Sequence, residues 1–280
     1  MLRRKMSLGV VLSMAGGEAA LVRARGRRAP KLLATAQSET AIAGFSPLDD
    51  SGVRQVFAEL VKALPNLVRR ADLPLHVSLP DPLVDEDILL FKDFPQNTTE
   101  AHDLIRLRLL REGPSGMQDP VCSFEVVGER DGSIVTRVRS MERALRDGIE
   151  DAVRASGLHV AKLEGWTCFC STGLAKVTGD GAFLWSDGTS WSLTCWSDAA
   201  PEGFFESGWV GSDPNVFLQR VGRLMHSFSL AHELGPLKLI TSLPDEIAPV
   251  LPPDVAASTQ PSDSVLFPSG SPALQVATWG

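Results

Sequence analysis

Common catalytic signatures are missing from this sequence. It has no Walker A loop, no Gly-x-Ser-x-Gly elbow, no His-Glu-x-x-His helix and no dinucleotide-binding glycine fingerprint. His232-Glu233 lacks the second histidine of a zinc protease, so we interpret it as a polar pair at the end of a helix. The sequence therefore gives no support to the enzyme classes that these motifs define.

Cysteine is scarce, with four residues in a chain of 280. That number is too small for a disulfide-dense framework at this length. Cys168 and Cys170 would share one face of a strand, and Cys195 could lie beside them. A metal site is one interpretation, but structural zinc ligand pairs are usually separated by about two to four residues. Buried free thiols are therefore the favoured interpretation.

Long apolar runs are also absent, since no segment reaches the ~20 continuous apolar residues of a membrane-spanning helix. We therefore expect a soluble or peripheral protein. The charged and apolar start also resembles a signal peptide, and an exported protein would have a mature chain beginning near Ala19 or Ala20. Ser13 and the Gly16-Gly17 pair interrupt the apolar run and favour a β-hairpin instead. Met6 is a second candidate for the true start, beside Met1.

Basic residues are unevenly distributed in this acidic chain, whose net charge is -7 and whose pI is about 5.3. The acidic balance argues against broad nucleic-acid binding. No basic residue follows Lys238. A basic N-terminal edge is compatible with anionic lipid, although a solvated hairpin surface is the favoured interpretation. Within the first thirty residues Glu18 is the one acidic residue, and the basic residues are Arg3, Arg4, Lys5, Arg23, Arg25, Arg27 and Arg28.

The stretch from Ser133 to Leu163 predicts a strand, a helix and a strand, because its apolar residues change from extended to helical spacing and back. Ser140 is the predicted N-cap, and Gly157 the predicted left-handed residue after the helix. Such a unit builds α/β sheets. The predicted helix has a polar face, which consists of Glu142, Arg143, Arg146, Asp147, Glu150 and Arg154.

Periodicity predicts the remaining elements along the chain. Helices are expected from Ser51 to Leu64, from Asn97 to Gly113 with Asn97 as the cap, and after Asp213-Pro214. Residues 244–280 are expected to be largely loop, except Leu274 to Ala277. Strands are expected at 7–13, 18–24, 31–38, 75–79, 88–91, 122–127, 174–178, 182–186, 189–196, 204–210 and 236–243.

Two further groups allow both a functional and a plain structural interpretation. Asp85, Glu86 and Asp87 could hold a cation, but a solvated acidic turn is favoured because no phosphate-binding companion accompanies them. Trp185, Trp191 and Trp196 could form a carbohydrate platform. Packing in a core covered on both sides is favoured for these tryptophans.

Four stretches carry a likeness to a known family: Leu75-His76-Val77-Ser78-Leu79-Pro80-Asp81, Phe94-Pro95, the helix from Thr98 to Leu110, and Ser133 to Leu163 with its Ala155-Ser156-Gly157-Leu158 exit. In the order of these elements the chain resembles the PilM family of pilus assembly proteins. The likeness covers about residues 7–240, in pattern more than in identity. The chain is similar also to the cytoplasmic domain of general secretion pathway L proteins and to MSHA pilus biogenesis proteins.

This resemblance implies an α/β, actin-like (ribonuclease H-like) fold of two lobes. It implies a first lobe at 1–164, with an inserted subdomain at about 85–164, a shortened second lobe at 165–243, and a Pro/Ser-rich C-terminal segment at 244–280. Active members carry an Asp-x-Gly turn in the first hairpin, where this chain has Val11-Leu12-Ser13. Asp187, Gly188 and Thr189 are the remnant candidate for cofactor binding in the second lobe.

The same resemblance implies a cytoplasmic scaffold of a type IV pilus or type II secretion system, peripheral to the inner membrane. Its expected partner is the cytoplasmic tail of a bitopic inner-membrane protein like PilN, with indirect coupling to the assembly motor ATPase and no nucleic acid. Arg143 and Arg146 are the candidate partner-binding residues. We expect no catalytic residue, no bound metal and no cofactor, ATP included. The alternative is an actin-like ATPase or kinase with active nucleotide binding.

Overall fold

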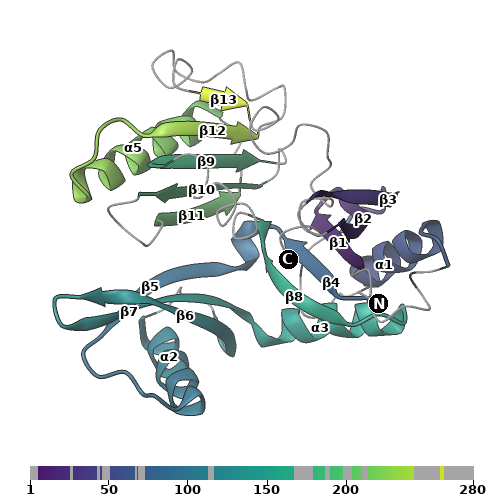
Figure 1. Ribbon diagram of the computed structural model, residues 1–280, viewed down its shortest axis with the longest axis horizontal. Coiled ribbons are helices and arrows are strands. Elements are labelled where there is room, and N and C mark those ends of the chain that lie inside the picture. Colours follow the sequence, from purple (N-terminus) through teal and green to yellow (C-terminus); the bar gives the residue numbers. More distant parts are fainter. Residues whose placement is uncertain are drawn as a thin grey trace. The chain divides into compact units, whose positions relative to one another are not determined.

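The computed structural model describes residues 6–25, 28–42, 45, 51–66, 68, 73–112, 117–166, 179–186, 190–197, 204–209, 214–242 and 259–261. These residues form three β-sheets (Figure 1). Contacts divide the chain into two compact units. The described residues of the first unit lie within 6–83 and 143–166. Those of the second unit lie within 84–142 and 179–261. The lobe boundaries expected from the resemblance stay a prediction.

The first unit is built on a five-stranded sheet in the order β3-β2-β1-β4-β8. The first three strands form an antiparallel meander, which confirms the hairpin expected near the start of the chain. Strands β4 and β8 run parallel to β1. The strands are β1 (Met6–Ser13), β2 (Gly16–Arg25), β3 (Arg28–Ser38), β4 (Leu75–Leu79) and β8 (Val160–Gly165).

Helices α1 (Ser51–Ala63) and α3 (Arg143–Ala155) belong to this unit and contact each other (Figure 1). The apolar stripe of α1 is buried, and Pro65 follows the helix; the stripe consists of Val53, Val56, Phe57, Leu60 and Val61. A Cβ atom added to Gly17 of β2 would lie 2.6 Å from Val56 Cγ1 and 3.3 Å from Leu12 Cδ2. Helix and sheet thus pack in direct contact over this glycine. Burial of each such Val or Leu side chain contributes about 1.5–3 kcal/mol.

The C-terminal end of α3 is as predicted, but its N-terminal end is not. Gly157 has φ +77°, its amide donates to Arg154 O, and the Leu158 amide donates to Val153 O, which together form a Schellman motif. Ser140 is not the N-cap, because it lies within β7 (Ser133–Glu142), paired with Asp85 on one side and Cys122 on the other. Pairing with β6 alone extends the strand from Ser140 to Glu142, so the helix begins at Arg143.

The strands on either side of α3 belong to different sheets. β8 pairs with β4 in the first sheet, whereas β7 is the central strand of a three-stranded sheet. The expectation of one sheet built by a strand, a crossover helix and a strand is therefore wrong at this point. The secondary structure of Ser133 to Leu163 is correctly predicted, but its strand pairing is set by partners far away in sequence.

The three-stranded sheet has the antiparallel order β5-β7-β6, with β5 (Asp85–Phe91) after a short 3₁₀ turn η1 (Asp81–Leu83) and β6 (Pro120–Arg130) at the other edge. Helix α2 (Thr98–Glu112) covers one face of it, where Ile105 and Leu109 meet Phe91 and Val138. Asn97 caps this helix as predicted, since its Oδ1 accepts a 2.9 Å hydrogen bond from the Thr99 amide.

The second five-stranded sheet has the order β11-β10-β9-β12-β13 and is covered on one face by α5 (Pro214–Ala231). Its strands confirm the expected meander. One short strand lies in the segment expected to be largely loop, where Pro261 ends an edge strand and needs no ladder donor. The strands are β9 (Gly181–Ser186), β10 (Ser190–Trp196), β11 (Phe204–Trp209), β12 (Lys238–Ser242) and β13 (Thr259–Pro261).

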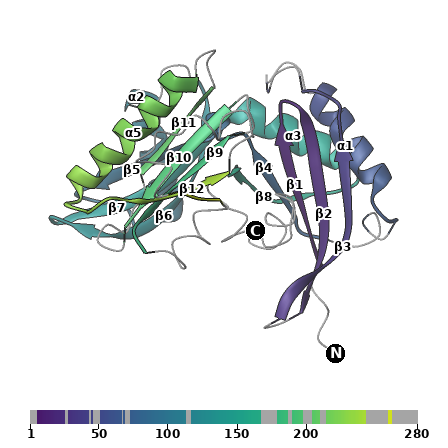
Figure 2. The ribbon, with the colours of Figure 1, turned by 90° about the horizontal axis from the view of Figure 1, so that it is seen from above.

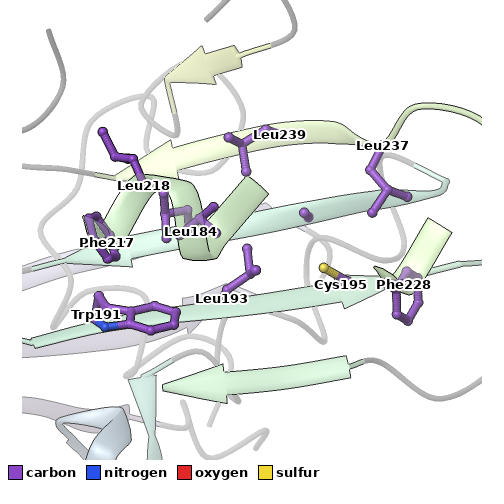
Figure 3. Close-up of a cluster of buried hydrophobic side chains, with 11 residues drawn as sticks. Leu184, Trp191, Leu193, Cys195, Phe217, Leu218, Phe228, Leu237 and Leu239 are labelled. Atoms are coloured by element: carbon purple, nitrogen blue, oxygen red, sulfur yellow. The ribbon is translucent and has the colours of Figure 1, made fainter. Parts of the chain in front are cut away.

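A continuous apolar cluster joins α5 to this sheet (Figure 3). Trp191 lies against Phe217 with 5.2 Å between ring centroids, and Leu193 and Cys195 follow it along β10. Trp185, Trp191 and Trp196 are all at least nine-tenths buried, which confirms core packing for the three tryptophans. Cys122 and Cys195 are free thiols, whereas Cys168 and Cys170 lie outside the described residues, as do the strand expected at 174–178 and the segment from Leu274 to Ala277.

Candidate functional site

The parallel strands β1, β4 and β8 end at one edge of the first sheet. Their register places Val11, Ser78 and Glu164 side by side just before that edge. In open α/β sheets, ligands bind outside the carboxyl ends of the parallel strands. This edge, with the β1–β2 turn beside it, is therefore the place in the first unit where a ligand site is expected.

The β1–β2 turn consists of Met14 and Ala15, because Ser13 pairs with Gly16. The corresponding place predicted from the sequence, Val11 to Ser13, is thus one step too early, since those residues lie within β1. Neither residue of the turn is acidic. The nearest carboxylate along β2 belongs to Glu18, opposite Val11 and Gln37.

The chain after β3 closes over this turn. The Ile42 amide donates a 3.0 Å hydrogen bond to the carbonyl oxygen of Met14. Gly16 has φ +140°, and a Cβ atom placed on it would lie 2.1 Å from Ser38 O. The turn is therefore held by the protein's own backbone on one side.

A carboxylate of α1 holds the end of β3 and the segment after it in place. The hydroxyls of Ser38 and Thr40 donate to Glu59 at 2.6 and 2.9 Å, and Gln55 Nε2 donates to the same carboxylate at 3.0 Å. The hydrogen bonds from Ser38, then Gln55 and Thr40, lower the pKa of Glu59. Glu59 therefore remains ionised and links α1 to the segment that covers the β1–β2 turn.

Polar side chains alternate with the buried apolar ones at the end of β4 and β8. His76 lies opposite Lys162, and Ser78 opposite Glu164, on the face of the sheet that does not meet α1. Lys162 Nζ lies 3.0 Å from Glu164 Oε2. Burial, together with the charge of Lys162, lowers the pKa of His76, so its imidazole is neutral.

This polar group of His76, Ser78, Lys162 and Glu164 was not predicted from the sequence. The Glu164 carboxylate is neutralised by Lys162, and the part of the chain that the structure describes contains no cluster of three or more His, Cys, Asp or Glu able to hold a metal ion. The strict alternation of His76 and Ser78 with Leu75, Val77 and Leu79 was the available signal.

The second-lobe candidates Asp187, Gly188 and Thr189 lie outside the described residues. The structure describes only their flanks, where Ser186 ends β9 and Ser190 begins β10, with Ser186 Oγ donating to Ser190 O at 2.7 Å. Their assignment as a cofactor-binding remnant therefore stays a prediction.

Arg143 and Arg146, the partner-binding candidates, lie in the first turn of α3 and are both half-buried. The Arg146 guanidinium contacts Asp147 Oδ1 at 2.6 Å and Glu150 Oε1 at 3.7 Å. These are helix-surface ion pairs of the predicted polar face. Their role toward a partner stays a prediction.

The acidic run Asp85-Glu86-Asp87 is not the solvated turn that the sequence favours, because it begins strand β5. Glu86 contacts Arg137 Nε at 3.1 Å and Arg139 Nε at 3.5 Å. Asp85 and Asp87 alternate with it onto the other face. Burial, with Asp87 as a second cause, raises the pKa of Asp85 to about 6.

Asp85→Asn is expected to stabilise the protein near neutral pH and to lose this advantage in acid. The pKa of Asp85 is higher in the folded than in the unfolded state. The contribution of the Asp85 side chain to the free energy of unfolding therefore falls as pH rises from 3.8 to about 6. Because the side chain is partly solvated, the expected gain in the free energy of unfolding at pH 7.5 is about 1 kcal/mol. Urea denaturation near neutrality and near pH 4 measures it. The exposed Asp103→Asn is the control, and an equal gain at both pH values would contradict the prediction.

No family model and no curated protein matches this chain in sequence. The structure nevertheless defines its class: it has the actin-like fold. It superimposes on a chain of the PilM-PilN type IV pilus biogenesis complex with a TM-score of 0.66 and 16% identity, over 97% of this chain and 96% of that chain. The cytoplasmic domain of EpsL, an inner-membrane component of the type II secretion system of Vibrio cholerae, gives a TM-score of 0.58 and 14% identity, over 98% and 94%.

A third similar structure is a protein of unknown function with an actin-like ATPase fold from Bacteroides thetaiotaomicron. Its TM-score is 0.57 at 9% identity, covering 98% of this chain and 95% of that chain. The expected fold class is thereby confirmed. In the residues that the structure describes, no helix is both long enough and apolar enough to cross a membrane.

Proposed function

We propose that this chain is a scaffold component of a type IV pilus or type II secretion system that binds the cytoplasmic tail of a bitopic inner-membrane protein. The observation that carries the proposal is the likeness to a chain of the PilM-PilN complex over almost the whole length of both chains. The likeness to the EpsL cytoplasmic domain supports the same class of assembly. In this role the protein lies in the cytoplasm beside the inner membrane and connects indirectly to the motor ATPase.

Titration with a synthetic tail peptide tests this function. The peptide is the cytoplasmic segment of a single-span, PilN-like protein, and a scrambled peptide of identical composition is the control. Saturable binding of the native peptide alone is expected. Equal binding of both peptides, or of neither, would contradict the proposal.

The same titration examines α3. We expect Arg143→Glu with Arg146→Glu to weaken peptide binding, because both arginines lie on the polar face of this helix. Arg111→Glu with Arg223→Glu changes the net charge equally at exposed positions of α2 and α5. Peptide binding that is unchanged by the α3 substitutions would remove these two residues from the site and leave the scaffold function standing.

We further propose that the scaffold works without nucleotide hydrolysis. The non-acidic Met14-Ala15 turn supports this, since the metal that accompanies a nucleotide phosphate would need an acidic anchor.

Calorimetry with Mg-ATP is accordingly expected to give no binding in the micromolar range, and a phosphate-release assay no turnover above buffer. The PilN-like tail peptide is added in a second phosphate-release assay, because a partner could complete a site. Micromolar affinity that Asp187→Ala abolishes would favour the alternative, an actin-like ATPase or kinase.

A further inference from the structure

The charge of this chain is divided sharply between its first 31 residues and the rest. Residues 1–31 hold eight basic side chains and one acidic one, Glu18, which gives this segment a net charge of +7. Because the whole chain carries -7, residues 32–280 carry -14. Basic charge so concentrated within an acidic protein produces a strong local field of one sign.

Strand pairing gathers much of this charge at one end of the first sheet. Arg23 on β2 lies opposite Lys31 on β3, and Arg25 lies opposite Arg28. Met6, the first residue of β1, pairs with Arg23 from the other side. The residues directly before Met6 in the sequence are Arg3, Arg4 and Lys5. We call the described strand residues at this end, Arg23, Arg25, Arg28 and Lys31, the basic ribbon end.

The basic ribbon end lies beyond the part of β1 that β4 covers. β4 pairs with β1 from Leu8 to Val11, so Arg23 and its partners continue past the last pair of that ladder. Figure 2 shows β2 and β3 extending as a twisted ribbon past helices α1 and α3. It is the end of the meander opposite to the Met14-Ala15 turn, so it is separate from the candidate site described above.

Its composition favours a lipid surface over a nucleic acid. Single-stranded nucleic acid is bound by aromatic stacking as well as by charge, and the first aromatic residue of the chain is Phe45. The acidic remainder would repel an extended polyanion that followed the protein surface, whereas a bilayer touched by one end would not have to follow it. Beside Lys31, Leu32 is 42% exposed and offers an apolar contact at the headgroup boundary.

We propose that the basic ribbon end binds anionic phospholipid directly and holds the protein on the membrane surface. About 1 kcal/mol per basic residue near an anionic leaflet makes four strand residues enough for reversible binding. The interaction rests on the charge layout and not on the tail-binding function. Purified vesicles without any partner therefore test it separately, and its failure leaves the scaffold proposal standing.

Co-sedimentation of the full chain with phosphatidylglycerol-containing vesicles is the experiment, with pure phosphatidylcholine vesicles beside it. We expect binding to the anionic vesicles alone. The triple variant Arg25→Glu, Arg28→Glu, Lys31→Glu should partition about a hundredfold more weakly. Arg111→Glu, Arg154→Glu, Arg223→Glu makes the same charge change at exposed positions elsewhere and should reduce partitioning far less.

A second measurement uses the unaltered chain, so that the test does not depend on the folding of a variant. Raising the salt from 0.1 M to 1 M shortens the Debye length from about 10 Å to about 3 Å and should release the protein from the vesicles. Three results would overturn the proposal: no binding to anionic vesicles at 0.1 M salt, equal losses in the two triple variants, or tighter binding to duplex DNA than to the vesicles under the same conditions.

Discussion

Replacing Gly16 by alanine is expected to lower the free energy of unfolding of the first unit by about 3 kcal/mol or more. Two causes act at this one position. Its φ of +140° lies in a region that L side chains rarely adopt, and the new Cβ atom would lie 2.1 Å from Ser38 O and 3.1 Å from Ser38 C. Both obstacles are backbone atoms, which cannot rotate away as a side-chain end would.

Relief of this clash would have to move β3 or the segment after it. That segment carries Ser38 and Thr40, which bond to Glu59, and Ile42, which bonds to Met14. Loss of these bonds adds to the strain, because the three contacts share one stretch of backbone.

Gly157→Ala is the matched control for Gly16→Ala. Gly157 also has a positive φ, +77°, but a Cβ atom there would meet nothing within 4 Å. Only the conformational cost of about 1 kcal/mol is therefore expected for Gly157→Ala. Urea denaturation followed by circular dichroism measures both variants. Equal losses of unfolding free energy at the two glycines would show that the backbone near Ser38 yields easily. The β1–β2 turn would then not be tightly held by that backbone.

Local sequence was sufficient where an element is defined by its own periodicity. The stripe from Val53 to Val61 predicted α1, and Gly157 predicted the exit of α3 with its left-handed conformation. Asn97 was correctly identified as a cap because the N-cap hydrogen bond joins residues close in sequence. Each of these features depends on groups within one or two helical turns.

Local sequence was insufficient where the outcome depends on pairing at long range. Ser140 suits an N-cap by type, but its neighbours Asp85 and Cys122, 55 and 18 residues away, keep it in a strand. The tether of Glu59 to Ser38 and Thr40 spans 21 and 19 residues and carries no sequence pattern. The lack of an acidic residue at the first hairpin was readable from sequence, whereas its closure by Ile42 was not.

Replacing Leu193 by alanine is expected to cost about 2–5 kcal/mol of unfolding free energy in the second unit. Leu193 is fully buried in the middle of β10, with β9 on one side and β11 on the other, and points into the cluster beneath α5 (Figure 3). Strands that are paired on both edges cannot close in to fill the space left by three carbon atoms. The lost contacts and the remaining cavity therefore both lower the free energy of unfolding of the variant.

Leu230→Ala in the last turn of α5 makes the identical chemical change at a position that is 66% exposed. Alanine is also the better helix former, so the free energy of unfolding should change by less than about 0.5 kcal/mol. Chemical denaturation of both variants gives the comparison. A small loss for Leu193→Ala, near that of Leu230→Ala, would mean that this sheet and α5 are loosely packed. Such packing would argue against a rigid scaffold, because a platform that holds a partner's tail in one geometry needs a core that resists local rearrangement.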